Sequence, residues 1–204
     1  MTDEEYLDAQ RKALADSVEF FNAANKPERE RWVVREFVTN LGLAFNDFEI
    51  QSPNQDPPDV NFRGANFEIK EILSTGRRRH QEYKEGLQQA LEATSPVDLV
   101  EMYTPKTIAV ANVCSRVYVD AKKLAERKYA PKTRAGLDLL FYVNLTNVTG
   151  ISGTSLPDLF PIEALGWRSV SFVMGHRSCT LSMTDDAPSF LLPALKRILH
   201  RKAN

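Results

Sequence analysis

The sequence has few features of a secreted or membrane-bound protein. It contains only two cysteines, Cys114 and Cys179, which are far apart and in no metal-binding spacing, so we expect reduced thiols. No apolar run is long enough to span a bilayer. The N-terminus is acidic and lacks the basic and then apolar segments of a signal peptide. These absences predict a cytoplasmic protein with no membrane partner.

The chain also lacks an excess of positive charge. Its formal net charge is −1, which excludes the strongly basic class of proteins that coat DNA. Binding to nucleic acid would therefore depend on local basic patches. One candidate patch consists of Arg77, Arg78, Arg79 and Lys84, and a second lies within residues 116–134 and includes Lys122 and Lys123. The alternative for such patches is a solvated helix face with no ligand.

Several catalytic signatures are missing as well. There is no Gly-rich loop followed by Lys-Ser or Lys-Thr, no dinucleotide-binding fingerprint and no Gly-x-Ser-x-Gly motif. The three histidines, His80, His176 and His200, are too dispersed for a zinc site of known spacing. We therefore expect neither ATP-driven work, nor nicotinamide chemistry, nor serine hydrolase chemistry.

The remaining pattern is that of a globular α/β protein. Of 204 residues, 43% are hydrophobic and 26% are charged, which suits one domain with a substantial core. Apolar residues at helical spacing predict helices, and alternating or continuous apolar runs predict strands. We expect helices at about 3–24, 28–41, 77–94, 116–130 and 187–201. We expect strands at 45–50, 137–144, 169–174 and 179–183, and a two-stranded hairpin within 59–73.

The most informative segment is the predicted hairpin at residues 59–70. With Gly64-Ala65 as a two-residue loop, Asp59 pairs with Lys70 and lies diagonal to Glu68. One face is then wholly apolar, and the other carries the polar side chains. The two carboxylates would have Cα atoms about 7–8 Å apart, close enough to hold one hard cation between them. A one-residue slip in strand register would move Asp59 to the wrong face.

Two carboxylates and a lysine on one face can hold a divalent metal ion and activate a water for phosphodiester cleavage. The alternative is an ordinary solvated hairpin face with a cross-strand Asp–Lys pair. The geometry of the segment leaves both readings open.

The segment resembles the signature of the PD-(D/E)XK nuclease superfamily. Pro58-Asp59 is followed, after a hairpin-length gap, by Glu68-Ile69-Lys70, and the similar region spans roughly residues 28–145. The chain also resembles a small bacterial family of uncharacterised proteins described as endonucleases.

The resemblance implies a restriction-endonuclease-like α/β fold over the whole chain. We expect one nuclease-like domain with N-terminal helices and a mixed central sheet of about four strands flanked by helices. The core would lie at about residues 28–145, and a C-terminal extension with a hairpin and a helix at about 150–204.

The resemblance also implies roles for single residues. Asp59, Glu68 and the Ile69 carbonyl would bind Mg²⁺ or Mn²⁺, and Lys70 would orient and help to deprotonate the attacking water. Helices before the motif often supply a further acid, for which Glu36 is the better placed candidate and Glu30 the other. A surface pair of Glu36 with Arg29 or Arg35 is the alternative.

The sequence therefore predicts a metal-dependent endonuclease that hydrolyses DNA, with RNA not excluded as a substrate. Members of the superfamily that cut both strands often dimerise, so a homodimer is expected. Two alternatives stay open at this point. The first is a catalytically silent nucleic-acid-binding or regulatory module on the same fold, and the second is an interaction protein with an unrelated α/β fold.

Overall fold

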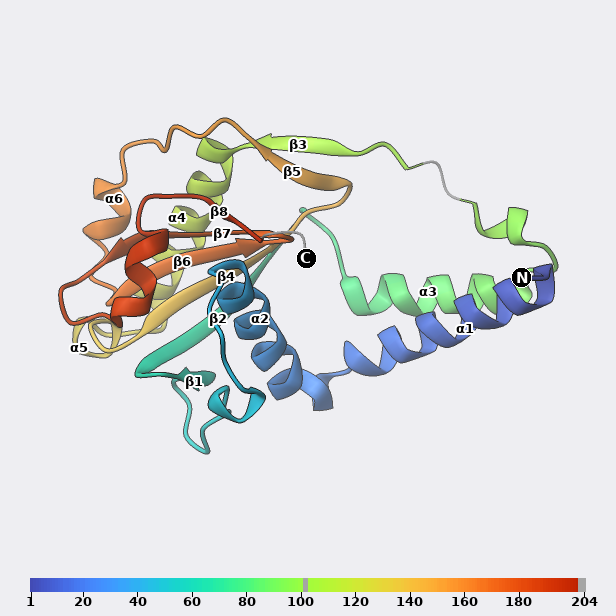
Figure 1. Cartoon of the computed structure of the whole chain (residues 1–204), viewed down its shortest axis with the longest axis horizontal. Helices are drawn as coiled ribbons and strands as arrows, with labels where there is room; N and C mark the ends of the chain where they lie inside the picture. The colour runs from blue at the N-terminus through green and yellow to red at the C-terminus, as the bar shows by residue number, and fades with distance from the viewer. Residues whose placement is uncertain (101–102, 202–204) are drawn as a thin grey trace. The chain divides into compact units, whose positions relative to one another are not determined.

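A computed structural model describes residues 1–100 and 103–201 of the chain (Figure 1). The fold divides into two compact units, each built from two stretches of sequence. The first unit is Met1–Arg29 with Thr75–Thr104, and the second is Glu30–Ser74 with Pro105–Asn204. None of the helices in the described part of the chain is long and apolar enough to cross a membrane.

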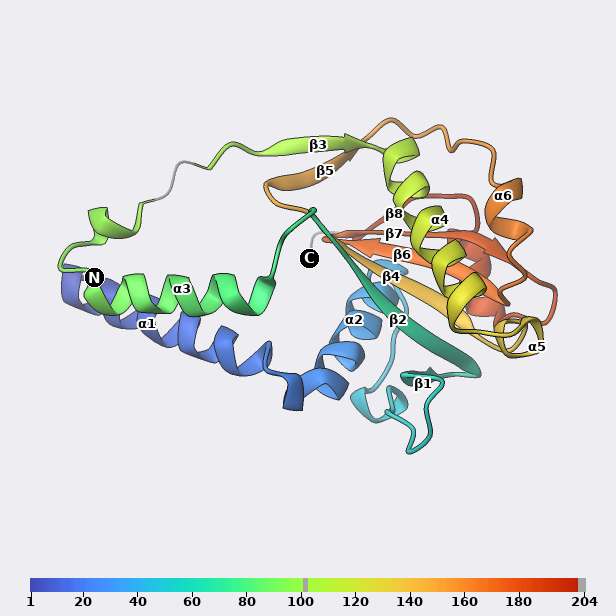
Figure 2. The same ribbon diagram turned by 180° about the vertical axis from the view of Figure 1, so that it is seen from behind.

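The first unit is an antiparallel pair of helices, α1 (Asp3–Phe20) and α3 (Arg79–Glu92), with the short helices η1 (Ala23–Asn25) and η3 (Pro96–Leu99). The two long helices lie side by side in Figures 1 and 2. The Arg11 guanidinium fixes their register by donating to the carbonyls of Ala90 and Ala93. At the other end of the pair, the ring of Phe21 stacks on Tyr83 at 4.9 Å. Both helices were predicted from their apolar spacing.

The second unit contains a mixed six-stranded sheet in the order β1-β2-β4-β6-β7-β8. Strands β2, β4 and β6 are parallel, and the other pairings are antiparallel. The bounds are β1 Val60–Phe62, β2 Ala65–Leu73, β4 Asp138–Asn144, β6 Ser169–Met174, β7 Arg177–Met183 and β8 Leu199–His200. Strands β3 (Lys106–Ala109) and β5 (Val148–Ser152) form a separate parallel pair.

Helices cover both faces of this sheet. On one face, α2 (Lys26–Asn40) packs Val34 and Phe37 against Phe67 and Leu140. On the other, α4 (Val110–Arg127) and α6 (Phe160–Glu163) pack against a core that includes Phe141. Figure 1 views the sheet from its α2 side and Figure 2 from its α4 side. Burial on both faces explains why β4 reads as a nearly continuous apolar run.

The α/β fold with N-terminal helices and a helix-flanked mixed sheet is therefore confirmed, with a larger sheet than expected. The hairpin of β6 and β7, together with β8, extends the central sheet to six strands instead of forming part of a separate extension. Ser171 and Thr180 are buried and hydrogen-bonded to each other across this hairpin. Because their hydroxyls are hydrogen-bonded, serine and threonine side chains can be buried in the core, and strands that contain them can lie in the central sheet.

Two predicted elements are wrong. Residues 45–50 contain the short helix η2 (Asp47–Glu49) instead of a strand, because Glu49 and Asn46 cap each other in a tight turn. Residues 187–201 form the short helix η4 (Ser189–Ala194) and then β8 instead of one α-helix. Pro193 lies inside this segment, and proline removes a donor that an α-helix needs. The α5 turn (Pro131–Arg134) follows α4.

Candidate metal centre

The hairpin of β1 and β2 sets the geometry of the site. Its turn is Arg63-Gly64, one residue earlier than expected, and both residues have positive φ angles (43° and 80°), as a type I′ turn requires. Val60 therefore pairs with Phe67, and each partner is shifted by two residues from the predicted register. Because side chains alternate with a period of two, this shift leaves every residue on its predicted face.

The corrected register places Asp59 opposite Glu68 instead of Lys70. The Asp59 amide donates to the Phe67 carbonyl at 2.9 Å, which continues the ladder beyond β1. The Asp59 carboxylate folds back and accepts the Ile69 amide at 2.8 Å through Oδ2. Asp59 is thus fixed by the backbone on both sides, and its carboxylate lies next to that of Glu68.

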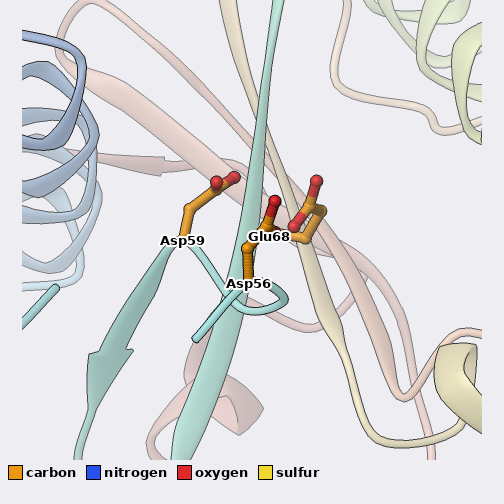
Figure 3. A group of neighbouring side chains, drawn as sticks. All are labelled: Asp56, Asp59 and Glu68. Atoms are coloured by element: carbon orange, nitrogen blue, oxygen red, sulfur yellow. The ribbon is translucent and has the colours of Figure 1, made fainter. Parts of the chain in front are cut away.

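Three carboxylates converge here: Asp56, Asp59 and Glu68 (Figure 3). Each offers an oxygen that lies within 4.8 Å of the others. Asp59 and Glu68 are buried, with 9% and 0% of their surface exposed, whereas Asp56 is exposed on the loop before β1. Asp59 and Glu68 therefore form the buried part of the site, and Asp56 forms the part that faces solvent.

The two oxygens of Glu68 have different surroundings. Oε1 accepts the Tyr129 hydroxyl at 2.5 Å and lies 2.5 Å from Lys70 Nζ and 3.3 Å from Lys128 Nζ. Oε2 is buried and has no hydrogen-bond partner among the described residues. An unpartnered buried carboxylate oxygen is costly and calls for an explanation. A bound cation would supply the missing partner.

Tyr129 is built to hold Glu68 in place. Its ring packs edge-on against Trp167 with centroids 5.6 Å apart, and its carbonyl accepts Arg134 Nη1 at 2.7 Å. Burial, together with the hydrogen bond to the Glu68 carboxylate, raises the pKa of the Tyr129 hydroxyl far above its usual range. The hydroxyl therefore stays protonated and acts only as a donor towards Glu68.

Lys70 links the carboxylates. Its Nζ lies 2.5 Å from Glu68 Oε1 and 3.6 Å from Asp59 Oδ2, and it donates to the Ile69 carbonyl at 2.7 Å. The Ile69 carbonyl, predicted as a metal ligand, accepts this hydrogen bond from Lys70. With Lys128, the lysines offset two of the three formal negative charges of the cluster. The remaining negative charge favours a cation.

The donor set fits a hard divalent cation. All candidate ligand atoms are carboxylate oxygens, which Mg²⁺ and Mn²⁺ prefer over the soft ligands that select zinc or copper. The free Oε2 of Glu68 gives this fit an independent structural reason. The acidic cluster could therefore hold a metal ion.

The structure does not bring Glu36 into this cluster. Its Oε2 accepts Arg201 Nη2 at 2.7 Å, so the alternative of an ion pair holds but with Arg201 as the partner in place of Arg29 or Arg35. Helix α2 packs on the sheet face of Phe67, and alternation puts Glu68 on the other face. The alternative acid, Glu30, is buried on α2.

The predicted basic patches have separate locations. Arg77, Arg78, Arg79 and Lys84 belong to the first unit, in which Arg77 pairs with Glu82 and the Arg79 guanidinium lies 3.8 Å from the centre of the Phe21 ring. In the second unit, Lys122 and Lys123 are exposed on α4 and lie 3.8 Å from Glu126 and 2.8 Å from Asp120. Besides Lys70, Lys128 contacts the acidic cluster, because its Nζ lies 3.3 Å from Glu68 Oε1.

Sequence reasoning missed Asp56, Lys128 and Tyr129 as members of the site. Asp56 left a signal, because it is an acid three residues before Asp59 in a loop stiffened by prolines. Lys128 was counted only as part of a basic run. Tyr129 left no signal, since nothing local shows that a tyrosine 61 residues from Glu68 will donate to its carboxylate.

Comparisons with known proteins place the chain in a family and agree with its fold. A family model described as "Putative endonuclease, protein of unknown function (DUF1780)" matches residues 2–204. A solved structure from Pseudomonas aeruginosa strain PAO1, described as protein of unknown function PA4535 of the monooxygenase superfamily, is similar with a TM-score of 0.65. The identity is 27%, over 100% of this chain and 98% of that one. No curated protein matches the chain.

Proposed function

The chain belongs to the DUF1780 family of proteins described as endonucleases, and from this premise we propose that it is a metal-dependent nuclease that hydrolyses phosphodiester bonds in DNA. The observation that carries the proposal is the free, buried Oε2 of Glu68 within a cluster of three carboxylates and a lysine. The monooxygenase description is the one given to the PA4535 structure. The cluster in this chain consists of carboxylate oxygens beside a lysine, and such a site suits the hydrolysis of phosphodiester bonds.

Asp56, Asp59 and Glu68 would hold Mg²⁺ or Mn²⁺ in this site. When bound, such an ion lowers the pKa of a coordinated water and offsets the charge that develops on the phosphate. Tyr129 and Lys128 hold Glu68 Oε1, which keeps Oε2 available to the ion. The Ile69 amide restrains Asp59 in the same way.

Lys70 is positioned to act on the reacting water and phosphate. Its partly exposed ammonium is fixed by Glu68 and by the Ile69 carbonyl. In the proposed reaction, the Nζ ammonium would orient the water, favour loss of its proton to solvent through its positive charge, and stabilise the charge on the phosphate oxygens, while the O3′ leaving group would take a proton from solvent. The water oxygen would bond to phosphorus as the P–O3′ bond breaks, leaving a 5′-phosphate and a 3′-hydroxyl.

The test is cleavage of supercoiled plasmid, with linear, branched and single-stranded DNA and an RNA strand compared under Mg²⁺ or Mn²⁺. Asp59→Asn and Lys70→Ala should each reduce the rate by about 100-fold or more. Glu71→Gln is a matched control, because Glu71 is an exposed acid on the same strand and points to the opposite face. Its rate should match that of the wild type.

Absence of cleavage, with no metal-induced rise in melting temperature that depends on Asp59, would contradict the proposal. The fold would then be assigned to a silent nucleic-acid-binding module. Two copies of the chain would present one site to each strand of a duplex, so we also propose a homodimer. Light scattering of the purified protein tests this part separately.

A further inference from the structure

A second polar site lies elsewhere in the second unit. A cavity of about 410 Å³ opens between β5, the start of β7 and the segment that leads into β8. It shares no lining residue with the acidic cluster. We call it the basic cavity, because its walls include Arg177, Lys196, Arg197 and His200.

The charge of the basic cavity is unusual for this chain. Three formally cationic side chains and a histidine line one space, although the protein as a whole has a net charge of −1. The residues that line the cavity include no acid. Glu163 pairs with Lys196 at 2.9 Å and offsets only one of these charges. The arrangement therefore creates a local positive potential that would attract an anion.

Arg177 gives the cavity a specific donor. Its side chain is half-buried, and Nη1 makes a long contact of 3.3 Å with the Thr149 carbonyl. Its Nε is buried and has no hydrogen-bond partner among the described residues. Unlike the ammonium of a surface lysine, a guanidinium presents a planar fork of donors that matches two phosphate oxygens. The protein contacts of the Arg177 guanidinium therefore leave part of its donor capacity unused.

The walls of the cavity are held in place by the fold. The Lys196 amide donates to the Thr180 carbonyl at 2.7 Å, although the φ angle of Lys196 is positive at 54°. Beyond β8, the Arg201 amide donates to the His176 carbonyl, and its side chain bonds to Asn40. Arg197 and His200 therefore lie on a segment that is secured at both ends. A strained residue held by its surroundings is typical of binding sites.

We propose that the basic cavity binds a phosphate group. The cavity offers the Arg177 guanidinium, three exposed cationic or titratable side chains (Lys196, Arg197 and His200) and room for a small anion. Two sources share this chemistry: a phosphate of a nucleic-acid backbone and the phosphate of a free mononucleotide. Neither source requires the acidic cluster to be catalytic, so this proposal stands or falls independently of the nuclease assignment.

The experiment measures binding to the full-length protein in EDTA, so that no hydrolysis contributes. The probes are inorganic phosphate, a deoxynucleoside 5′-monophosphate and a fluorescent DNA duplex, each at constant ionic strength with sulfate and chloride as reference salts. The test variant is Arg177→Gln with Arg197→Gln. Lys12→Gln is the control, because Lys12 is an exposed cation on α1 that belongs to neither predicted basic patch and does not line the basic cavity. His200→Gln is a second test variant at an exposed position that should not affect folding.

We expect phosphate to raise the melting temperature of the wild type and the control more than chloride does at the same ionic strength. In the double variant this difference should disappear, and affinity should fall about tenfold or more. Loss of duplex binding as well would identify a nucleic-acid phosphate as the ligand. Loss of only monophosphate binding would identify a free nucleotide. Equal binding of all probes by the wild type, the control and both test variants would overturn the proposal.

Discussion

Replacing Tyr129 by phenylalanine tests whether the acidic site depends on a donor from outside the carboxylate cluster. The change removes one hydroxyl, which donates to Glu68 Oε1 at 2.5 Å in a fully buried position. The phenyl ring keeps its edge contact with Trp167. The effect is therefore confined to the hydrogen bond, and no large cavity is created.

The expected magnitude follows from the charge of the acceptor. A hydrogen bond to a charged group contributes about 1.5–3 kcal/mol, so the free energy of unfolding should fall by about that amount. Because Lys70 and Lys128 still contact Glu68 Oε1 in the variant, we expect the decrease in the free energy of unfolding to lie towards the lower end of this range. Affinity for Mg²⁺ or Mn²⁺ should fall about 10- to 100-fold, since groups that orient a metal ligand typically have this effect.

Urea denaturation gives the first quantity, and calorimetric titration with Mn²⁺ gives the second. Tyr118→Phe is the matched control, because Tyr118 lies on α4 and contacts Lys122 instead of the cluster. It should change neither quantity. If Tyr129→Phe binds Mn²⁺ as tightly as the wild type while Glu68→Gln does not bind it, the reasoning that Tyr129 orients Glu68 is refuted.

Three other predictions concern the framework around the site. Asp138→Ala should lower the free energy of unfolding by about 3–5 kcal/mol in urea, because it leaves Arg168 without its buried partner; a loss below 1 kcal/mol would contradict this. Gly64→Ala should cost about 1–2 kcal/mol, since its φ angle is 80°, and an unchanged urea midpoint would argue against the turn. Burial raises the pKa of Cys114 to about 11 and that of Cys179 to about 12. At pH 8 both should therefore be thiols that react with a colorimetric thiol reagent only after unfolding, and rapid labelling of the native protein would disprove their burial.

The sequence predicted those parts of the fold that depend on local periodicity. The apolar stripes of α1 and α3, the buried run of β4 and the alternation in β2 are all readable within one element. The faces of the hairpin were also predicted correctly, because the turn shifted every pair by two residues and not by one. Asp59, Glu68 and Lys70 are together for this reason.

The parts that were missed depend on contacts between distant segments. Glu36 seemed available as a ligand because its partner, Arg201, is 165 residues away. The predicted helix at residues 187–201 was wrong for another reason: Pro193 interrupts it, and β8 pairs with β7. No pattern within a helix or strand reports which distant side chain will neutralise a charge.

The division into two interleaved units also bears on how this chain can be synthesised and dissected. The backbone crosses from one unit to the other at residues 29–30, 74–75 and 104–105. Helix α1 can pack only after α3 has been synthesised, and β2 can pair with β4 only after β4 has been synthesised. In each case, the residues between the two elements include a segment of the other unit. Closing a loop of 30 residues costs roughly 3 kcal/mol in chain entropy. A single proteolytic cut at 74–75 would therefore yield neither unit whole, whereas a cut at 29–30 would leave the second unit in one fragment and a cut at 104–105 would leave the first.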